Sequence, residues 1–150
     1  MNRFAPSNYF RTMRIRLQQD GNSFHFVAQN EQNNDVHIDA SPAIGGQNKG
    51  ARPMELLVMG LGGCSAIDVI SILRKQRIEV EGMRIEIDAE REPDVIPSLF
   101  RNIHIVFIFK GAIDLAKVER AVALSMEKYC SVAKTLEKTA TITSSIRVEA

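Results

Sequence analysis

The sequence predicts an α+β protein whose elements follow the order βββ-α-ββ-α-α-β. Short segments show the period-two alternation of strands, and two long segments repeat apolar residues at the period of a helix. Because the strands come in groups rather than alternating singly with helices, the pattern favours an α+β arrangement. A chain of 150 residues suits one domain spanning residues 1–150, and we expect residues 1–10 to be disordered.

The first part of the chain is predicted to be strand and loop. Residues 14–18 alternate, residues 20–22 form the turn signal Asp-Gly-Asn, and residues 24–27 resume the strand, which together indicate a hairpin. Residues 36–39 are a third short strand. Residues 41–51 contain three glycines without apolar periodicity, so we expect a loop.

One long helix is predicted over residues 53–76. Pro53 suits the first helical position, where its missing N–H costs nothing, and Glu55 complements the helix dipole. Basic residues favour its end. Three of its glycines, Gly60, Gly62 and Gly63, each cost about 1 kcal/mol relative to alanine. A close helix–helix approach or access of a small substrate to Cys64 could offset that cost, and the two are compatible.

The second half of the chain continues with strands and helices. Strands are predicted over residues 83–89 and 102–109. Asp114 is placed to cap a helix over residues 115–129. The remaining predicted elements are a short helix over residues 131–138 and a closing strand over residues 141–148.

Composition excludes several classes of function. Apolar residues make up 45% and charged residues 25%, as in globular proteins. The net charge of +1 gives no electrostatic argument for nucleic acid or for an anionic membrane. The longest apolar run, residues 56–67, is shorter than the about 20 residues of a span, and residues 1–14 hold no secretory signal. We therefore expect a soluble, cytoplasmic protein without membrane or nucleic-acid partners, in which a disulfide would be transient.

The two cysteines are the candidate reactive groups. Cys64 lies about three turns into its helix, too far for the dipole to activate it, and an ionised Asp68 nearby would disfavour its thiolate. Activation would need a cation from elsewhere, for which Arg52 or one of the N-terminal arginines is a candidate. Cys130 lies at a helix boundary, where N–H groups could stabilise a thiolate. For both, an inert packed cysteine remains open from position alone.

Other chemistry is not indicated. His25, His37 and His104 fall in separate strands without metal-ligand spacing, so no metal site is expected. The chain has no Walker loop and neither the GxGxxG nor the GxSxG motif.

Two motifs carry a family resemblance. Residues 48–57, NKGARPMELL, lead into Gly62-Gly63-Cys64-Ser65, and residues 128–136 read KYCSVAKTL. From residue 36 onward the chain resembles the OsmC/Ohr superfamily of thiol-dependent hydroperoxide reductases, most of all its OsmC-like redox proteins. The resemblance implies two long central helices wrapped by sheets in an intertwined homodimer, with active sites at the subunit interface.

The resemblance also implies an activity. Cys64 would be the peroxidatic and Cys130 the resolving cysteine of a peroxidase in oxidative stress defence. An external dithiol, such as a lipoylated protein, would reduce the disulfide, and no bound cofactor is expected. Apolar residues near Cys64 would suit an organic hydroperoxide better than a very polar substrate, with hydrogen peroxide as the other candidate.

The electrostatic part of the family pattern is changed in this chain. The family places a glutamate directly after the helix-starting proline, whereas here Met54 stands there and Glu55 follows. The family's activating arginine lies in the first hairpin turn, and here Arg52 could substitute. The candidate site residues are therefore Cys64, Cys130, Glu55 and Arg52.

Two other functions remain open from the sequence. The changed arginine and glutamate favour a non-catalytic dimer that binds a small molecule or senses redox state on the same scaffold. A purely structural dimer with two buried cysteines is the third possibility. Retention of both cysteines favours the peroxidase.

Overall fold

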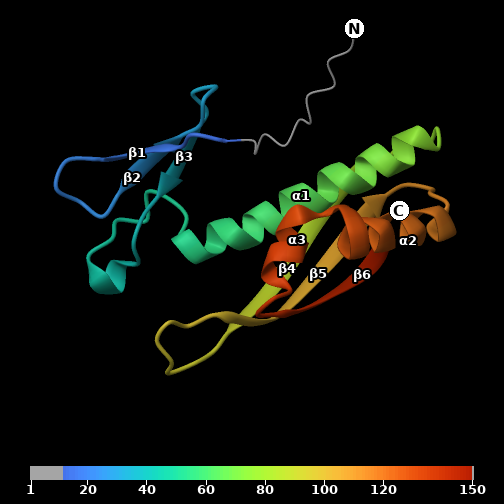
Figure 1. Cartoon of the computed structure of the whole chain (residues 1–150). Coiled ribbons are helices and arrows are strands. Elements are labelled where there is room, and N and C mark those ends of the chain that lie inside the picture. The colour runs from blue at the N-terminus through green and yellow to red at the C-terminus, as the bar shows by residue number, and fades with distance from the viewer. Residues whose placement is uncertain (1–11, 150) are drawn as a thin grey trace, which may run out of the picture. The chain divides into compact units, whose positions relative to one another are not determined.

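The computed structural model describes residues 12–149, which group into two compact units divided after Pro53 (Figure 1). The disorder expected for residues 1–10 lies outside the described residues, and the single-domain expectation stays a prediction. The predicted element order βββ-α-ββ-α-α-β is confirmed.

The first unit is a three-stranded antiparallel sheet. Its strands are β1 (Arg16–Gln19), β2 (Phe26–Gln29) and β3 (Asp35–Ile38), and they pair in that order. The predicted hairpin turn is present, and Gly21 takes a φ of 61° there, a backbone conformation that glycine adopts without steric cost. The following loop holds a 3₁₀ turn over Pro42–Ile44.

Asp39 organises the loop that leads towards the long helix. Its carboxylate is buried and accepts backbone N–H groups from Ala40, Gln47 and Lys49 at 2.8, 2.9 and 3.0 Å. A buried carboxylate needs such partners to offset its lost hydration. These bonds fix the backbone of a segment that has no regular secondary structure of its own.

The second unit packs helices on one face of a three-stranded sheet. The strand order is β4-β5-β6, with β4 and β5 antiparallel and β5 and β6 parallel. A parallel pair needs a crossover, which the two shorter helices supply. The elements are α1 (Pro53–Lys75, whose first residue belongs to the first unit), β4 (Gly82–Arg91), β5 (Phe100–Lys110), α2 (Leu115–Leu124), α3 (Ser131–Leu136) and β6 (Thr141–Glu149).

The end of the second helix corrects the sequence prediction. Asp114 caps α2 as expected, accepting the Lys117 N–H at 3.3 Å. The predicted regular helix over residues 115–129 instead ends at Leu124 and continues as a π-helical turn, Ser125–Tyr129. The Ser125 N–H is shared between two carbonyls where the pattern changes, and the Cys130 N–H donates to the Ser125 carbonyl at 2.8 Å. Such turns widen a helix by one residue and are frequent at functional sites.

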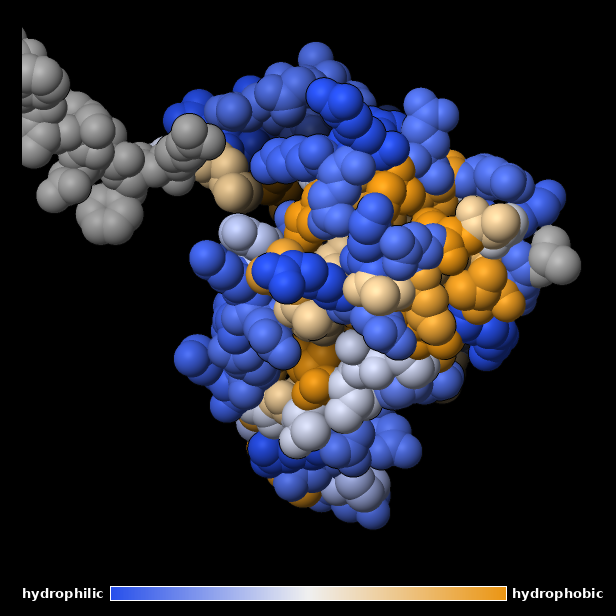
Figure 2. Space-filling model, turned by 90° about the vertical axis from the view of Figure 1, so that its right-hand side faces the viewer, coloured by the Kyte–Doolittle hydropathy of each residue, from blue (hydrophilic) through white to orange (hydrophobic). Residues whose placement is uncertain are grey.

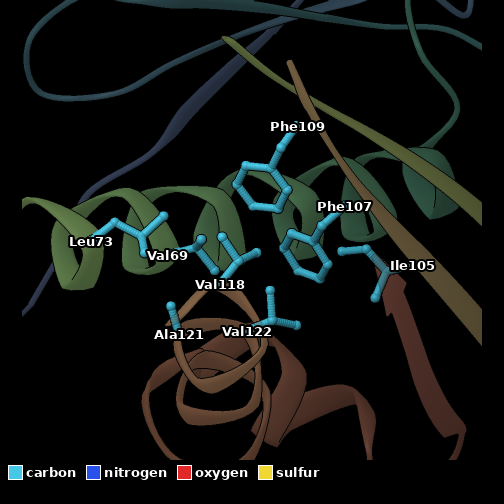
Figure 3. Close-up of a cluster of buried hydrophobic side chains, with 8 residues drawn as sticks. All are labelled: Val69, Leu73, Ile105, Phe107, Phe109, Val118, Ala121 and Val122. Carbon is cyan, nitrogen blue, oxygen red and sulfur yellow. The ribbon is translucent and has the colours of Figure 1, made fainter. Parts of the chain in front are cut away.

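The core of this unit lies between α1, α2 and β5. Figure 3 shows side chains from these three elements pointing towards one another. The alternation of β5 places every second residue on the helix side, and each fully buried large side chain contributes about 1.5–3 kcal/mol. The buried members are Val69, Leu73, Ile105, Phe107, Phe109, Val118, Ala121 and Val122.

The glycines of α1 play different parts. A Cβ on Gly62 would lie 3.1 Å from Cδ1 of Ile87, so this glycine lets α1 approach the sheet. The sequence predicted that these glycines allow two helices to approach closely. At Gly62 the neighbouring element is instead a strand, because Ile87 lies on β4. A Cβ on Gly60 or Gly63 would meet no atom of the described residues within 4 Å beyond its own helix turn and chain neighbours.

The other side of α1 is apolar and exposed. Figure 2 shows apolar side chains, in orange, at the surface among polar ones on the face that it presents. On α1, Ile67 is 67%, Met59 57% and Leu57 44% exposed. By length and composition α1 could cross a membrane, although core helices of soluble proteins pass the same test, and 28% of its most apolar stretch is buried.

Candidate active site at the paired cysteines

The fold brings three reactive side chains to one point. The sulfurs of Cys64 and Cys130 and a carboxylate oxygen of Asp68 all lie within 4.8 Å of one another. Cys64 and Asp68 are one turn apart on α1 and so share a face. Cys130 follows the π-helical turn Ser125–Tyr129 and caps the start of α3, where it lies beside that face of α1. The two cysteines predicted to act together are thus neighbours.

The two thiols differ in access to solvent. Both are free; Cys64 is partly exposed, whereas Cys130 is fully buried. A reagent from solvent therefore meets Cys64 first. Cys130 belongs to a second apolar cluster, whose other buried members are Leu61, Phe100, Ile103, Ala133, Leu136 and Ala140.

Burial dominates the electrostatics of Cys130. It raises the pKa of this thiol from the ordinary 9.0 to about 11, and the neighbouring Cys64 sulfur, which accepts the thiol's hydrogen bond, adds to the rise. Backbone N–H groups of Ala133 and Val132 act in the opposite direction, Ala133 at 3.4 Å from the sulfur. The predicted helix N-terminus is thus present, but burial raises the pKa of Cys130 by more than the N–H groups lower it. Cys130 therefore holds its proton at neutral pH.

Asp68 has a buried partner across the helix interface. The Ser125 hydroxyl lies 3.2 Å from Oδ2 of Asp68 and 3.4 Å from the Ser65 carbonyl, and its one proton can serve one of them at a time. Asp68 appeared in the sequence analysis only as an unfavourable neighbour of Cys64, and Ser125 was missed. The Cys-x-x-x-Asp spacing was the available signal for Asp68.

The other two predicted site residues flank the start of α1, with Arg52 just before it and Glu55 in its first turn. Arg52 donates to the Gly50 carbonyl at 3.1 Å and to Oδ1 of Asn48. Glu55 is exposed in the first turn of α1 and lies nine positions before Cys64, about 13 Å away along the axis. Within one chain Glu55 therefore does not contact the Cys64 sulfur. The roles of Arg52 and Glu55 stay predictions.

His25 and His37, which were predicted to lie in separate strands without metal-ligand spacing, are neighbours in the first unit. Nε2 of the buried His25 is 2.9 Å from Nδ1 of His37, and Nδ1 of His25 is 3.0 Å from a carboxylate oxygen of Asp20. This chain of hydrogen bonds ties the hairpin turn to β3. It also satisfies a buried imidazole, as buried polar groups require.

Residues 46–145 match the family described as OsmC-like protein, a region that contains both cysteines and Asp68. The chain belongs to the OsmC/Ohr superfamily. The family and the OsmC-like α+β fold predicted from the sequence are therefore confirmed, while the dimer that the resemblance implies is not tested by a single chain.

Individual proteins are similar to this chain over most of its length. Protein YhfA of Escherichia coli K12 is 50% identical over 105 residues, which cover 69% of this chain and 77% of YhfA. A hypothetical protein of Aquifex aeolicus VF5 has a solved structure that is 28% identical with a TM-score of 0.76, covering 94% of this chain and 100% of that one. An organic hydroperoxide resistance protein OsmC of Legionella pneumophila shares the fold, with 13% identity, a TM-score of 0.70 and coverage of 94% and 100%.

Proposed function

We propose that this OsmC-like protein is a cysteine-based hydroperoxide reductase. The observation that carries the proposal is the pairing of a partly exposed thiol with a fully buried one, their sulfurs within 4.8 Å. A peroxidatic cysteine must meet its substrate, and a resolving cysteine must be close by and sheltered from it. The hydroperoxide resistance described for the Legionella relative, which shares the fold, is compatible with this role.

The reaction consists of three balanced steps. The Cys64 thiolate attacks one peroxide oxygen, the O–O bond breaks, and the alcohol leaves with a proton while Cys64 becomes a sulfenic acid. Cys130 then attacks the Cys64 sulfur, so that a disulfide forms and water leaves. An external dithiol, such as a lipoylated protein, supplies two electrons and two protons to restore both thiols. A reducing compartment such as the cytoplasm would keep this cycle running.

Asp68 has a place in the second step. Because burial keeps Cys130 protonated, its proton must be removed as the sulfur attacks. The Asp68 carboxylate, within 4.8 Å of that sulfur, is positioned to receive the proton and pass it to the departing hydroxide. The Ser125 hydroxyl, 3.2 Å from the carboxylate, would hold it in place for that transfer.

The exposed side of α1 supports the homodimer that belongs to this proposal. Gly60 and Gly63 leave open space beside the helix, and Ile67 and Met59 expose apolar surface next to them. A bilayer could cover the same surface, but α1 already buries Val69 against β5 and α2, and a spanning helix would have to leave that core. A second copy of the chain covers the exposed side without disturbing the core.

A titration of the reduced protein with cumene hydroperoxide tests the activity. We expect both thiols to disappear, one hydroperoxide to be consumed per chain, and the intact mass to fall by two hydrogens. Cys64→Ser should abolish consumption, and Cys130→Ser should stop at a sulfenic acid that dimedone traps. Consumption that is slow and equal in wild type and Cys64→Ser would refute the enzymatic function.

A redox sensor is the second candidate. It is favoured by the changed glutamate, because Met54 stands where the family's peroxidases place a glutamate and Glu55 follows one position later. A sensor would be oxidised once per chain and would not turn over. Hydroperoxide consumption in the presence of excess dihydrolipoamide separates the two, because only the peroxidase consumes many equivalents per chain.

A further inference from the structure

The cluster of Cys64, Asp68 and Cys130 offers more than a pair of thiols. It presents two sulfurs and a carboxylate oxygen to one point, partly or fully shielded from solvent. We propose that the reduced cluster is a binding site for a thiophilic divalent cation, and that Zn²⁺ is the ion it fits best. The proposal rests on the placement of these three side chains and does not depend on peroxidase turnover.

The spacing of the three atoms suits a tetrahedral ion. Zn–S bonds of about 2.3 Å and Zn–O bonds of about 2.0–2.2 Å place the ligands of a tetrahedral site roughly 3.4–3.8 Å apart. The three atoms lie within 4.8 Å of one another, so a shift of about 1.4 Å or less closes the site. Rotation of side chains on the fixed helices α1 and α3 supplies such a shift.

Asp68 is the group that favours a metal over a simple dithiol. Disulfide exchange needs two sulfurs, and a carboxylate beside two thiolates would repel them in a shielded site. A divalent cation reverses the sign of that interaction, because it attracts all three ligands. Ser125 donates to Asp68 from the opposite helix, which is the kind of outer hydrogen bond that orients a carboxylate ligand.

The ligand set selects the kind of ion. Two thiolates favour Zn²⁺ and similar soft or borderline ions, whereas Mg²⁺ and Ca²⁺ require mainly oxygen ligands. Three protein ligands leave a fourth position, which the partial exposure of Cys64 opens to water or to an external thiol.

Occupancy would regulate the proposed reaction, and this step rests on the proposed function. A bound ion engages both sulfurs and so shields the reduced pair. Oxidation by one hydroperoxide and two protons would give the disulfide, an alcohol, water and the released cation. The cluster would thus have two alternative states, a reduced state that binds the cation and an oxidised state that holds a disulfide.

Anaerobic titration of the fully reduced chain with Co²⁺ tests the site. We expect a sulfur-to-cobalt charge-transfer band that saturates at one Co²⁺ per chain and disappears when Zn²⁺ displaces the cobalt. Cys64→Ser and Cys130→Ser should each remove about half of the band intensity, because each removes one of two sulfurs. Asp68→Asn should weaken Co²⁺ binding at least tenfold, while the exposed Asp88→Asn on β4 should leave it unchanged.

A second measurement needs no variant. Zn²⁺ should protect the partly exposed Cys64 thiol of the wild-type chain from alkylation, and a chelator should restore the reactivity of that thiol. Absence of the band, a band unchanged in either serine variant, or an affinity unchanged in a folded Asp68→Asn chain would overturn the proposal. The metal assays contain no peroxide, so their result is independent of the cumene hydroperoxide titration. A charge-transfer band in a chain that consumes no hydroperoxide in that titration refutes the proposed function alone. Hydroperoxide consumption by a chain that shows no band refutes the metal site alone.

Discussion

The thiol of Cys130 shows how burial can override a helix N-terminus. Its pKa is about 11 in the folded chain, against an ordinary 9.0. Below pH 9 the thiol is protonated in folded and unfolded chains alike. As pH rises from 9 to 11 the unfolded chain loses this proton first, so we expect the free energy of unfolding to fall by about 2–3 kcal/mol over that range.

Urea denaturation of the reduced protein at a series of pH values measures this effect. Cys130→Ser is the matched control, because a serine hydroxyl suits the same N-terminal position of α3 and does not titrate in this range. The decline between pH 9 and 11 should be smaller in this variant by about 2–3 kcal/mol. Equal declines in both proteins would contradict the raised pKa.

Asp68 allows a kinetic prediction at the same scale. Asp68→Asn keeps the size of the side chain and its bond to Ser125 but removes the proton acceptor. In metal-free protein, we expect Cys64 oxidation to continue while disulfide formation slows at least tenfold. Quenched samples should then contain dimedone-reactive sulfenic acid. Disulfide formation as fast as in the wild type would exclude Asp68 from the second step.

Some features of this site could be predicted from the sequence and others could not. The Cys64–Cys130 pair could be predicted because its motifs resemble a family and both lie in its characteristic segments. The contact between Ser125 and Asp68 could not, because it joins residues 57 positions apart through the packing of two helices. The π-helical turn that sets Cys130 in place has no local pattern that distinguishes it from an ordinary helix end.

The elements followed their sequence patterns more closely. The six predicted strands lie within a few residues of the observed ones, and in β5 every second residue from Ile103 to Phe109 is buried. The glycines of α1 signalled a close approach but not its partner, which at Gly62 is the strand residue Ile87. The local sequence shows that one face of the helix carries small residues. Which element packs against that face depends on the tertiary fold.

The packing of helix α2 can be tested with one buried and one exposed residue of the same helix. Val118 is fully buried against α1 and β5, whereas Leu115, one turn earlier, is 48% exposed. Val118→Ala should lower the free energy of unfolding by about 2–3 kcal/mol, because it removes buried methyl groups and leaves a cavity. Leu115→Ala should cost less than about 1 kcal/mol. Thermal or urea unfolding measures both, and equal costs would contradict this packing of α2.

At the scale of the whole molecule, the exposed side of α1 predicts self-association. Ile67 is 67% exposed beside Gly63, and a second copy would bury it. Light scattering of the wild type should therefore give twice the chain mass of 16.7 kDa. A glutamate there would be buried without a partner at great cost, so Ile67→Glu should shift the mass towards that of one chain.

Ile96→Glu is the control for that substitution, because Ile96 is 98% exposed in the β4–β5 connection and a charge there meets solvent. This variant should keep the mass of the wild type. If Ile67→Glu stayed dimeric as well, α1 would not form the interface. Binding of the wild-type monomer to lipid vesicles would favour the bilayer as the cover of this helix. Since α1 carries Cys64, loss of hydroperoxide consumption in a folded, monomeric Ile67→Glu chain would further indicate that the active site is complete only in the dimer.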